Sequence, residues 1–293
     1  MFLVIAASLS WSLVGVLVKT AALQFDPFTI TFARFSIGVL ALAVIVLATA
    51  GSLRPALLGR WIWIGALGKS VNYLAENAAI SIGYAYGSVL VGPVQTIVLL
   101  LLGVLAFRER LTAKSWASAA VVLAGVLCIA LNGRSFWGML EAQGWTTLLF
   151  VVSGVGAALH ILSQKMLLQT MNDVSMNYSV FLWASIVVAA PLPFASDWEP
   201  AFVPGAWIAA VALGLITGLS FVMMSRALRT VRFSVAVIVS NLASLFAVVW
   251  SWAFLREPIT PQIVFGACLL VAGMTLLNWP AKGARMKRKS ASV

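Results

Sequence analysis

The sequence is poor in charge, in histidine and in cysteine. Only 9% of its 293 residues are Asp, Glu, Lys or Arg, against about 25% in a typical soluble domain, while 62% are hydrophobic. Because so few charged side chains cannot cover a soluble globule of this size, we predict an all-α integral membrane protein. The single histidine and the two cysteines, both in apolar segments, offer neither a set of metal ligands nor a disulfide framework, and we predict no cofactor and no metal site.

Catalytic motifs are also missing. The sequence lacks the GxSxG, HExxH and GxxxxGK[ST] patterns, so we predict that the protein is not an enzyme. The net charge of +11 would suit a nucleic-acid partner, but five of the 19 Lys and Arg residues lie in the short tail 281–293. A basic tail beside an apolar segment typically contacts anionic headgroups of the cytoplasmic leaflet. The predicted partners are therefore membrane lipids, and no nucleic acid.

What the sequence does contain is a series of apolar runs with short polar breaks. About 20 apolar residues suffice to cross a hydrocarbon core about 30 Å thick as a helix. The N-terminal run has no basic segment before it and continues to Val18, so we interpret it as a span and not as a signal peptide. The ten predicted spans cover residues 2–19, 27–49, 59–81, 85–107, 113–131, 144–168, 174–195, 204–226, 233–254 and 260–279.

Basic residues between these spans and at the span ends are unevenly divided between the two sides. With a cytoplasmic N-terminus, 14 of them fall on the cytoplasmic side and only Lys19, Arg134 and Arg256 on the other. Positive charge in short loops marks the cytoplasmic side of a membrane protein. Both termini are therefore predicted to be cytoplasmic.

One short pattern occurs twice in the chain. Residues 108–112 read RERLT and residues 256–260 read REPIT, 148 positions later. Each half holds five spans, and because five is odd, the second copy must enter the membrane from the opposite side. We predict two inverted five-helix repeats, residues 1–135 and 144–280, around a central cavity, followed by the basic tail 281–293.

These features resemble the drug/metabolite transporter superfamily, in particular its EamA family of ten-span bacterial carriers. The residues that carry the resemblance are Trp11-Ser12 and Lys19, Asp26-Pro27, Phe32-Ala33-Arg34, Gly92-Pro93-Val94, and the Arg-Glu-x-x-Thr pattern after the fourth and ninth spans. The resemblance covers nearly the whole chain. It implies two five-helix halves around a central cavity, alternating access, and a place in the bacterial inner (plasma) membrane.

Members of this family are similar to exporters of amino acids and other small metabolites, and one group exports aromatic amino acids. The present sequence has no Trp-Pro pair in its fourth span, where that group has one. This difference argues against an aromatic substrate.

The third predicted span carries most of the polar residues at mid-membrane depth. Lys69, Asn72, Tyr73 and Glu76 follow helical spacing and share one face. An ionised side chain in a span costs about 2.5–3.5 kcal/mol on insertion scales, so this face should line a water-filled cavity. We predict that these four residues bind substrate.

Two interpretations of Glu76 stay open. It is either a structural counter-ion for Lys69 or Arg34, or the group that binds a substrate amine or a coupling proton. Arg34, in the second span, is open in the same way: its guanidinium either forms a structural ion pair or holds a substrate carboxylate.

The remaining candidates lie in other spans. His160, midway along the sixth span, is either satisfied by a neighbouring carbonyl or hydroxyl or lines the cavity, with Gln164 one turn on. Pro93 lacks a backbone donor, which suggests a local break that serves gating or only fits the packing. The other predicted substrate contacts are Trp11, Gln95 and Asn241.

The predicted function is secondary transport, the export of amino acids or similar small metabolites. One acid, two bases, amides and aromatic rings suit a zwitterionic or amine-containing small molecule. A carrier of sugar phosphates, nucleotide sugars or lipid precursors is the alternative, although phosphate recognition calls for a cluster of cationic donors. A channel is a weaker alternative, since inverted repeats serve the exchange of two conformations.

Overall fold

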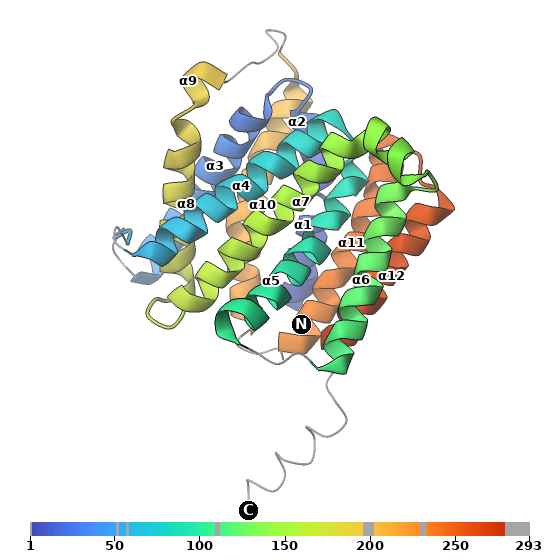
Figure 1. The fold of residues 1–293 in the computed structure, drawn as a ribbon. Coiled ribbons are helices and arrows are strands. Elements are labelled where there is room, and N and C mark those ends of the chain that lie inside the picture. Colours follow the sequence, from blue (N-terminus) through green and yellow to red (C-terminus); the bar gives the residue numbers. More distant parts are fainter. Residues whose placement is uncertain are drawn as a thin grey trace, which may run out of the picture.

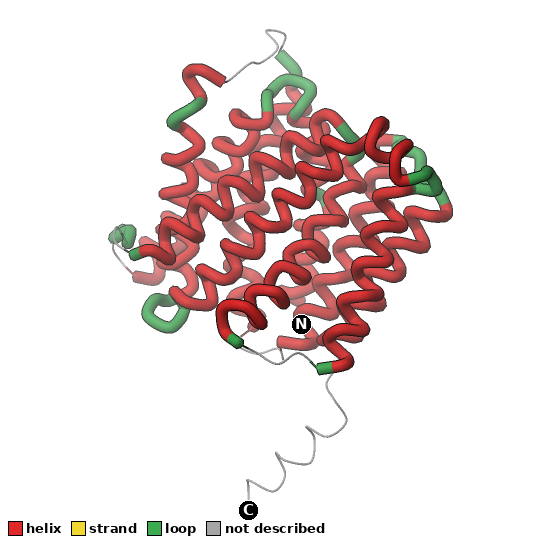
Figure 2. Tube along the Cα trace, viewed as in Figure 1, coloured by secondary structure: helices red, strands yellow, loops and turns green. Residues whose placement is uncertain are grey.

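The computed structural model describes residues 2–50, 53–56, 59–108, 112–195, 202–228 and 233–278, which are helical with no β-strand among them (Figures 1 and 2). The elements are α1 (Phe2–Ser12), α2 (Val14–Ala21), α3 (Pro27–Ala50), α4 (Arg60–Ile82), the 3-10 helix η1 (Ala85–Leu90), α5 (Val91–Phe107), α6 (Ala113–Leu131), α7 (Phe136–Leu167), α8 (Asp173–Ala189), α9 (Leu192–Ala195), α10 (Pro204–Leu228), α11 (Phe233–Leu255) and α12 (Pro261–Asn278).

The helices have the length and composition of a multi-pass membrane protein. Within the described residues, six helical segments are long and apolar enough to span a bilayer: Phe2–Ala21, Pro27–Ala48, Ala85–Leu105, Ala113–Leu131, Phe136–Leu167 and Pro204–Met224. Three more apolar segments are shorter: Asp173–Ala189, Ala243–Leu255 and Pro261–Leu277. The 23-residue α4 belongs to neither group, because its polar residues lower its mean hydropathy.

Each predicted span coincides with a helix, but several boundaries were wrong. The first span is interrupted at Leu13, where the hydroxyls of Ser10 and Ser12 donate to backbone carbonyls one turn earlier. Such bonds compete with the helical ladder and bend helices. The seventh span was predicted to continue to residue 195, but α8 ends at Ala189, two residues before Pro191.

The sixth span also begins earlier than predicted. Helix α7 starts at Phe136, and the Ser135 hydroxyl accepts the N–H of Gly138 as its N-cap. Gln143 has non-helical dihedral angles (φ −144°, ψ 16°) and breaks the helix into a short first segment and a long second one. The apolar run alone marked only the second segment.

The first and last residues of the repeated Arg-Glu-x-x-Thr pattern have the same local structure in both copies. Arg108 and Arg256 each follow the last residue of a long helix with φ 54°, in the left-handed region. The hydroxyl of Thr112 accepts the N–H of Ser115, and that of Thr260 accepts the N–H of Ile263. Each copy thus ends one helix and caps the next. Glu109 and Arg110 lie outside the described residues.

Helix α4 packs against α3, α7 and α8 and leaves a face with Trp63, Leu67 and Val71 exposed, whereas α10 packs against α1, α2 and α3. Helices α6 and α12 pair with each other at one edge of the bundle (Figure 1).

Glycines allow the closest crossings between helices. A Cβ on Gly156 of α7 would lie 2.6 Å from the backbone nitrogen of Asn72, and a Cβ on Gly218 of α10 would lie 2.9 Å from the carbonyl oxygen of Gly38.

Replacing Gly156 by alanine should destabilise the protein, because neither backbone at this crossing can yield locally. We expect a loss of about 1–3 kcal/mol, typical of overpacking, seen as a lower thermal unfolding temperature in detergent. The control is Gly205→Ala, where the new Cβ would meet only the Thr20 methyl group at 3.8 Å. Equal unfolding temperatures for the two variants would contradict the close α4–α7 contact.

Candidate functional site

A cavity of about 320 Å³ lies among α1, α2, α3, α4, η1, α5, α7, α10 and α11, and we call it the central cavity. It is lined by Trp11, Ser12, Val14, Arg34, Lys69, Asn72, Tyr73, Glu76, Ser88, Val89, Val91, Gly92, Gln95, Ala157, His160, Ile161, Phe221, Ala243, Ser244 and Ala247. Its polar side chains come mainly from one face of α4, as the helical spacing predicted.

Most of the predicted site residues meet at this cavity. The lining includes Trp11, Arg34, Lys69, Asn72, Tyr73, Glu76, Gln95 and His160. Gln164 does not line it; its amide donates to Asn177 Oδ1 at 3.0 Å, between α7 and α8. Pro93 is buried in α5 and does not line it either. The side chain of Asn241 lies outside the described residues.

Several lining residues were missed from the sequence. Ser12 and Ser88 contribute hydroxyls, and Phe221 contributes an aromatic ring that meets Trp11 edge-on at 5.5 Å between centroids. Ser88 carries a weak signal, because Ser234 occupies the corresponding place in the second half. No signal marks Phe221, since it is one apolar residue within a uniformly apolar helix.

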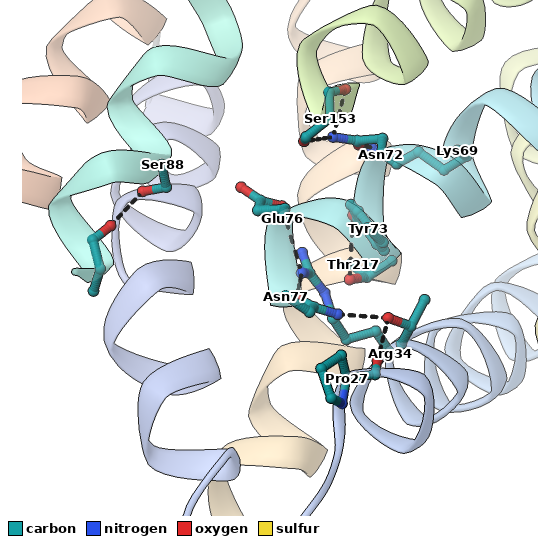
Figure 3. A network of polar contacts seen from close by, with 12 residues as sticks. Pro27, Arg34, Lys69, Asn72, Tyr73, Glu76, Asn77, Ser88, Ser153 and Thr217 are labelled. Atoms are coloured by element: carbon teal, nitrogen blue, oxygen red, sulfur yellow. Dashed lines mark hydrogen bonds and ion pairs between the residues drawn. The ribbon is translucent and has the colours of Figure 1, made fainter. Parts of the chain in front are cut away.

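Arg34 is held by contacts from α4. Its Nη1 donates to Asn77 Oδ1 at 2.8 Å and lies 3.6 Å from Glu76 Oε2, while its guanidinium carbon lies 3.6 Å from the centre of the Tyr73 ring (Figure 3). The side chain is only 2% exposed. A cation buried to this degree needs such compensation, because an unpaired buried charge is strongly destabilising.

Asn77 connects Arg34 to the start of α3. Its amide nitrogen donates to Thr31 Oγ1 at 2.7 Å, and the Thr31 hydroxyl donates to the Pro27 carbonyl at 2.6 Å. Asn77 is fully buried, so its oxygen and nitrogen are both committed to this chain. The chain fixes the guanidinium in position and leaves Nε of Arg34 without a hydrogen-bond partner among the described residues.

Lys69 is positioned by a second chain of polar contacts. Its ammonium donates to Asn72 Oδ1 at 2.9 Å, and the Asn72 amide donates to Ser153 Oγ at 2.8 Å. The ammonium also lies 4.2 Å from the centre of the Tyr73 ring and 5.0 Å from that of Phe221. These aromatic contacts offset part of the cost of burying the charge.

Tyr73 therefore supports both cations of the site. Its hydroxyl lies 3.5 Å from Thr217 Oγ1 of α10, and Phe35 stacks on its ring at 5.1 Å between centroids. The phenol is held from two sides and 4% exposed. A rigid ring of this kind keeps Arg34 and Lys69 at one wall of the cavity.

Glu76 is the more accessible member of the ion pair. It is 13% exposed, and Figure 3 shows its carboxylate directed away from Asn77, toward the segment that carries Ser88. The 3.6 Å contact fits the counter-ion interpretation, while the cavity lining leaves the carboxylate available to a bound cation. Both interpretations are compatible with this geometry.

His160 presents an unused nitrogen at the cavity wall. Its Nδ1 lies 3.3 Å from the Gly65 carbonyl and, as the donor there, leaves Nε2 as an acceptor. Nε2 is buried and has no hydrogen-bond partner within the described part of the chain. The ring stacks on Phe181 at 5.9 Å between centroids. A donor on a bound molecule would satisfy this nitrogen.

Comparison with known families identifies the family of the chain. The profile of the EamA-like transporter family matches residues 1–131 and again residues 144–279. The chain belongs to the EamA-like transporter family. It is thus a membrane transporter, and the resemblance noted in the sequence is confirmed.

Two individual proteins are similar to this chain over nearly their full length. The chain is 25% identical over 289 residues to the pseudopaline exporter CntI of Pseudomonas aeruginosa (strain UCBPP-PA14), covering 96% of each chain. A solved crystal structure with 18% identity superposes with a TM-score of 0.69 over 96% of this chain and 98% of that one, which shows a shared fold.

The Asn77 chain should contribute measurably to stability. In Asn77→Ala, both the Arg34 guanidinium and the Thr31 hydroxyl lose a buried partner, so we expect a loss of about 1–3 kcal/mol. Thermal unfolding followed by tryptophan fluorescence measures it. Gln169→Ala, which removes an exposed amide, is the control. If both variants unfold at the wild-type temperature, the Arg34–Asn77–Thr31 contacts are not stabilising.

Proposed function

We propose that the protein is a secondary transporter that exports amino acids or similar small metabolites by alternating access. The observation that carries this proposal is the placement of Arg34, Lys69 and Glu76 around one buried cavity. Two cations and one carboxylate can hold the two ends of a zwitterion. The Tyr73, Phe221 and Trp11 rings offer apolar contact to the part between them.

The size of the central cavity favours a small substrate. Its volume of about 320 Å³ is near the lower end of the range of about 300–1,000 Å³ for small-molecule sites. A nucleotide sugar or a lipid precursor would need more room. Phosphate carriers also need a cluster of cationic donors, and here Glu76 offsets one of the two cations.

The helix packing supports two inverted repeats, residues 1–135 and 144–280. Under this relation α1 and α2 together correspond to α7, α3 to α8, α4 to α10, and α5 to α11. The packing of α4 on α7 then has its counterpart in the packing of α10 on α1 and α2. Likewise, the packing of α5 on α7 has its counterpart in that of α11 on α1. The twofold match to the family profile and the shared φ of Arg108 and Arg256 point the same way.

Orientation and direction are parts of the same proposal. The excess of basic residues in the even-numbered connections and the tail favours cytoplasmic termini in the inner membrane. Export is favoured by the similarity to a protein named as an exporter. The basic tail 281–293 lies outside the described residues, and its contact with lipid headgroups stays a prediction.

The test is counterflow in proteoliposomes. The purified protein would first be screened by thermal shift against amino acids, amines, nucleosides and phosphorylated metabolites, and the stabilising compounds would then be assayed for flux. We expect stabilisation by compounds that carry both an amine and a carboxylate, and saturable flux stimulated by substrate on the opposite side. Stabilisation by phosphorylated compounds alone would favour the alternative carrier, and linear flux would favour a channel.

Removing one charge at a time should show which residue binds which end of the substrate. Lys69→Met should raise the KM for a zwitterionic substrate about tenfold or more, because a charge-assisted hydrogen bond is lost. It should leave the transport of the matching amine, which lacks the carboxylate, nearly unchanged. Glu76→Gln should show the reverse selectivity, measured on the matching acid without the amine.

Glu141→Gln, in an exposed position on α7, is the matched control for Glu76→Gln. We expect both variants to fold, as judged by thermal unfolding. If Glu76→Gln transports every substrate at the wild-type rate at all pH values, Glu76 is only a structural counter-ion.

A further inference from the structure

A second cavity lies beyond the central one. It has a volume of about 690 Å³, and its walls come from the ends of α2 and α4, the start of α7 and the connection between α11 and α12. Arg134, Gln143 and Arg256 are among its lining residues. In the proposed orientation this cavity, which we call the vestibule, is on the outer face.

The 3-10 helix η1 separates the two cavities. Tyr84, directly before η1, lines the vestibule, while Ser88 and Val89 of η1 line the central cavity. Between them, Ala85 and Tyr86 are buried and pack in one apolar cluster with Val14 and Val18 of α2. The six residues of η1, packed on α2, therefore form part of the partition between the two cavities.

Glu257 attaches this partition to the second half of the chain. Its Oε1 accepts the N–H of Ala85 at 2.7 Å and its Oε2 accepts the N–H of Tyr86 at 3.2 Å. The residue is 6% exposed, although it belongs to the connection between α11 and α12. One carboxylate thus satisfies two backbone donors of a segment 171 residues or more away in sequence.

Lys19 holds the other side of the same junction. Its ammonium donates to the carbonyls of Ile80, Ser81 and Gly83 at 3.0, 3.2 and 2.6 Å, where α4 ends. The last carbonyls of a helix otherwise lack partners, and a cation there is favourable. Lys19 and Glu257 also attract each other electrostatically.

Two backbone N–H groups of η1, the Lys19 ammonium and the Ser251 hydroxyl compensate the Glu257 carboxylate. Burial raises the pKa of the Glu257 carboxyl, and the N–H groups of Ala85 and Tyr86, together with the Lys19 ammonium, act against that effect. If η1 moved away from the loop, the amides and the carboxylate would each have to find water instead. The contact therefore favours the conformation in which the partition is in place.

We propose that Glu257 and Lys19 form a latch that holds the outer gate closed, with η1 as the gate. This inference rests on the proposed function as an alternating-access carrier, since it assigns the closed side of one of its two states. Opening would require Glu257 to release η1, which joins the central cavity to the vestibule. Neither residue lines the central cavity, so the latch acts on access and not on substrate binding.

The latch can be tested through the accessibility of the gate. A reporter cysteine at Ser88, which lines the central cavity, would be placed in a background with Cys128 and Cys268 replaced by serine. Right-side-out membrane vesicles would be labelled with a membrane-impermeant maleimide in the absence of substrate. Glu257→Gln and Lys19→Met are the test variants, and Glu141→Gln, an exposed carboxylate on α7, is the control.

We expect slow labelling from outside in the unaltered background and in Glu141→Gln. Glu257→Gln and Lys19→Met should each label about tenfold faster, because each removes charge-assisted hydrogen bonds of the closed state. Thermal unfolding of the same variants shows whether they are folded. Fast outer labelling before any latch substitution, no increase in either latch variant, or an equal increase in Glu141→Gln would overturn the proposal.

Transport assays separate this outcome from the proposed function. If the latch variants label faster but no tested metabolite shows saturable flux, the gate stands and the substrate assignment fails. If flux is saturable and labelling is unaffected by the substitutions, the carrier stands and the latch is wrong.

Discussion

The polar face of α4 is the constraint on which the rest of the structure depends. A helix that carries Lys69, Asn72, Tyr73 and Glu76 on one side cannot expose that side to hydrocarbon, where unpaired polar groups are costly. It is therefore enclosed by α3, α7 and α8. The crossing with α7 is close enough to bring Ser153 onto Asn72, and only glycine at position 156 leaves room for that approach.

The enclosed polar groups are arranged so that the protein itself compensates most of their charge. Asn77 and Tyr73 hold Arg34, while Asn72 and the aromatic rings hold Lys69. All four of Arg34, Lys69, Glu76 and His160 line the cavity, and Glu76, 13% exposed, is the more accessible member of the ion pair with Arg34. Such a site has side chains held in fixed positions and a few hydrogen-bonding groups without a partner in the described part of the protein. It suits a ligand that is bound and released repeatedly, because neither step requires the lining side chains to rearrange.

The sequence predicted the helices and the cavity wall well, because both follow from periodicity. Each predicted apolar run coincides with a helix, six of them within segments long and apolar enough to span a bilayer, and helical spacing located the face that Lys69 shares with Glu76. Local breaks were harder: the interruptions at Leu13 and Gln143 depend on hydroxyl back-bonding and on tertiary packing, which leave no pattern in composition. Side-chain contacts between helices could not be predicted either, as the pairing of Gln164 on α7 with Asn177 on α8 shows.

The shortness of η1 sets the scale of the motion that transport needs. A 3-10 helix rises about 2 Å per residue, so a six-residue partition is roughly 12 Å long. A metabolite crossing it travels little more than its own length. Displacing this two-turn segment would open the central cavity toward the vestibule, and the exchange of sides is complete only when the cavity also closes toward the other compartment.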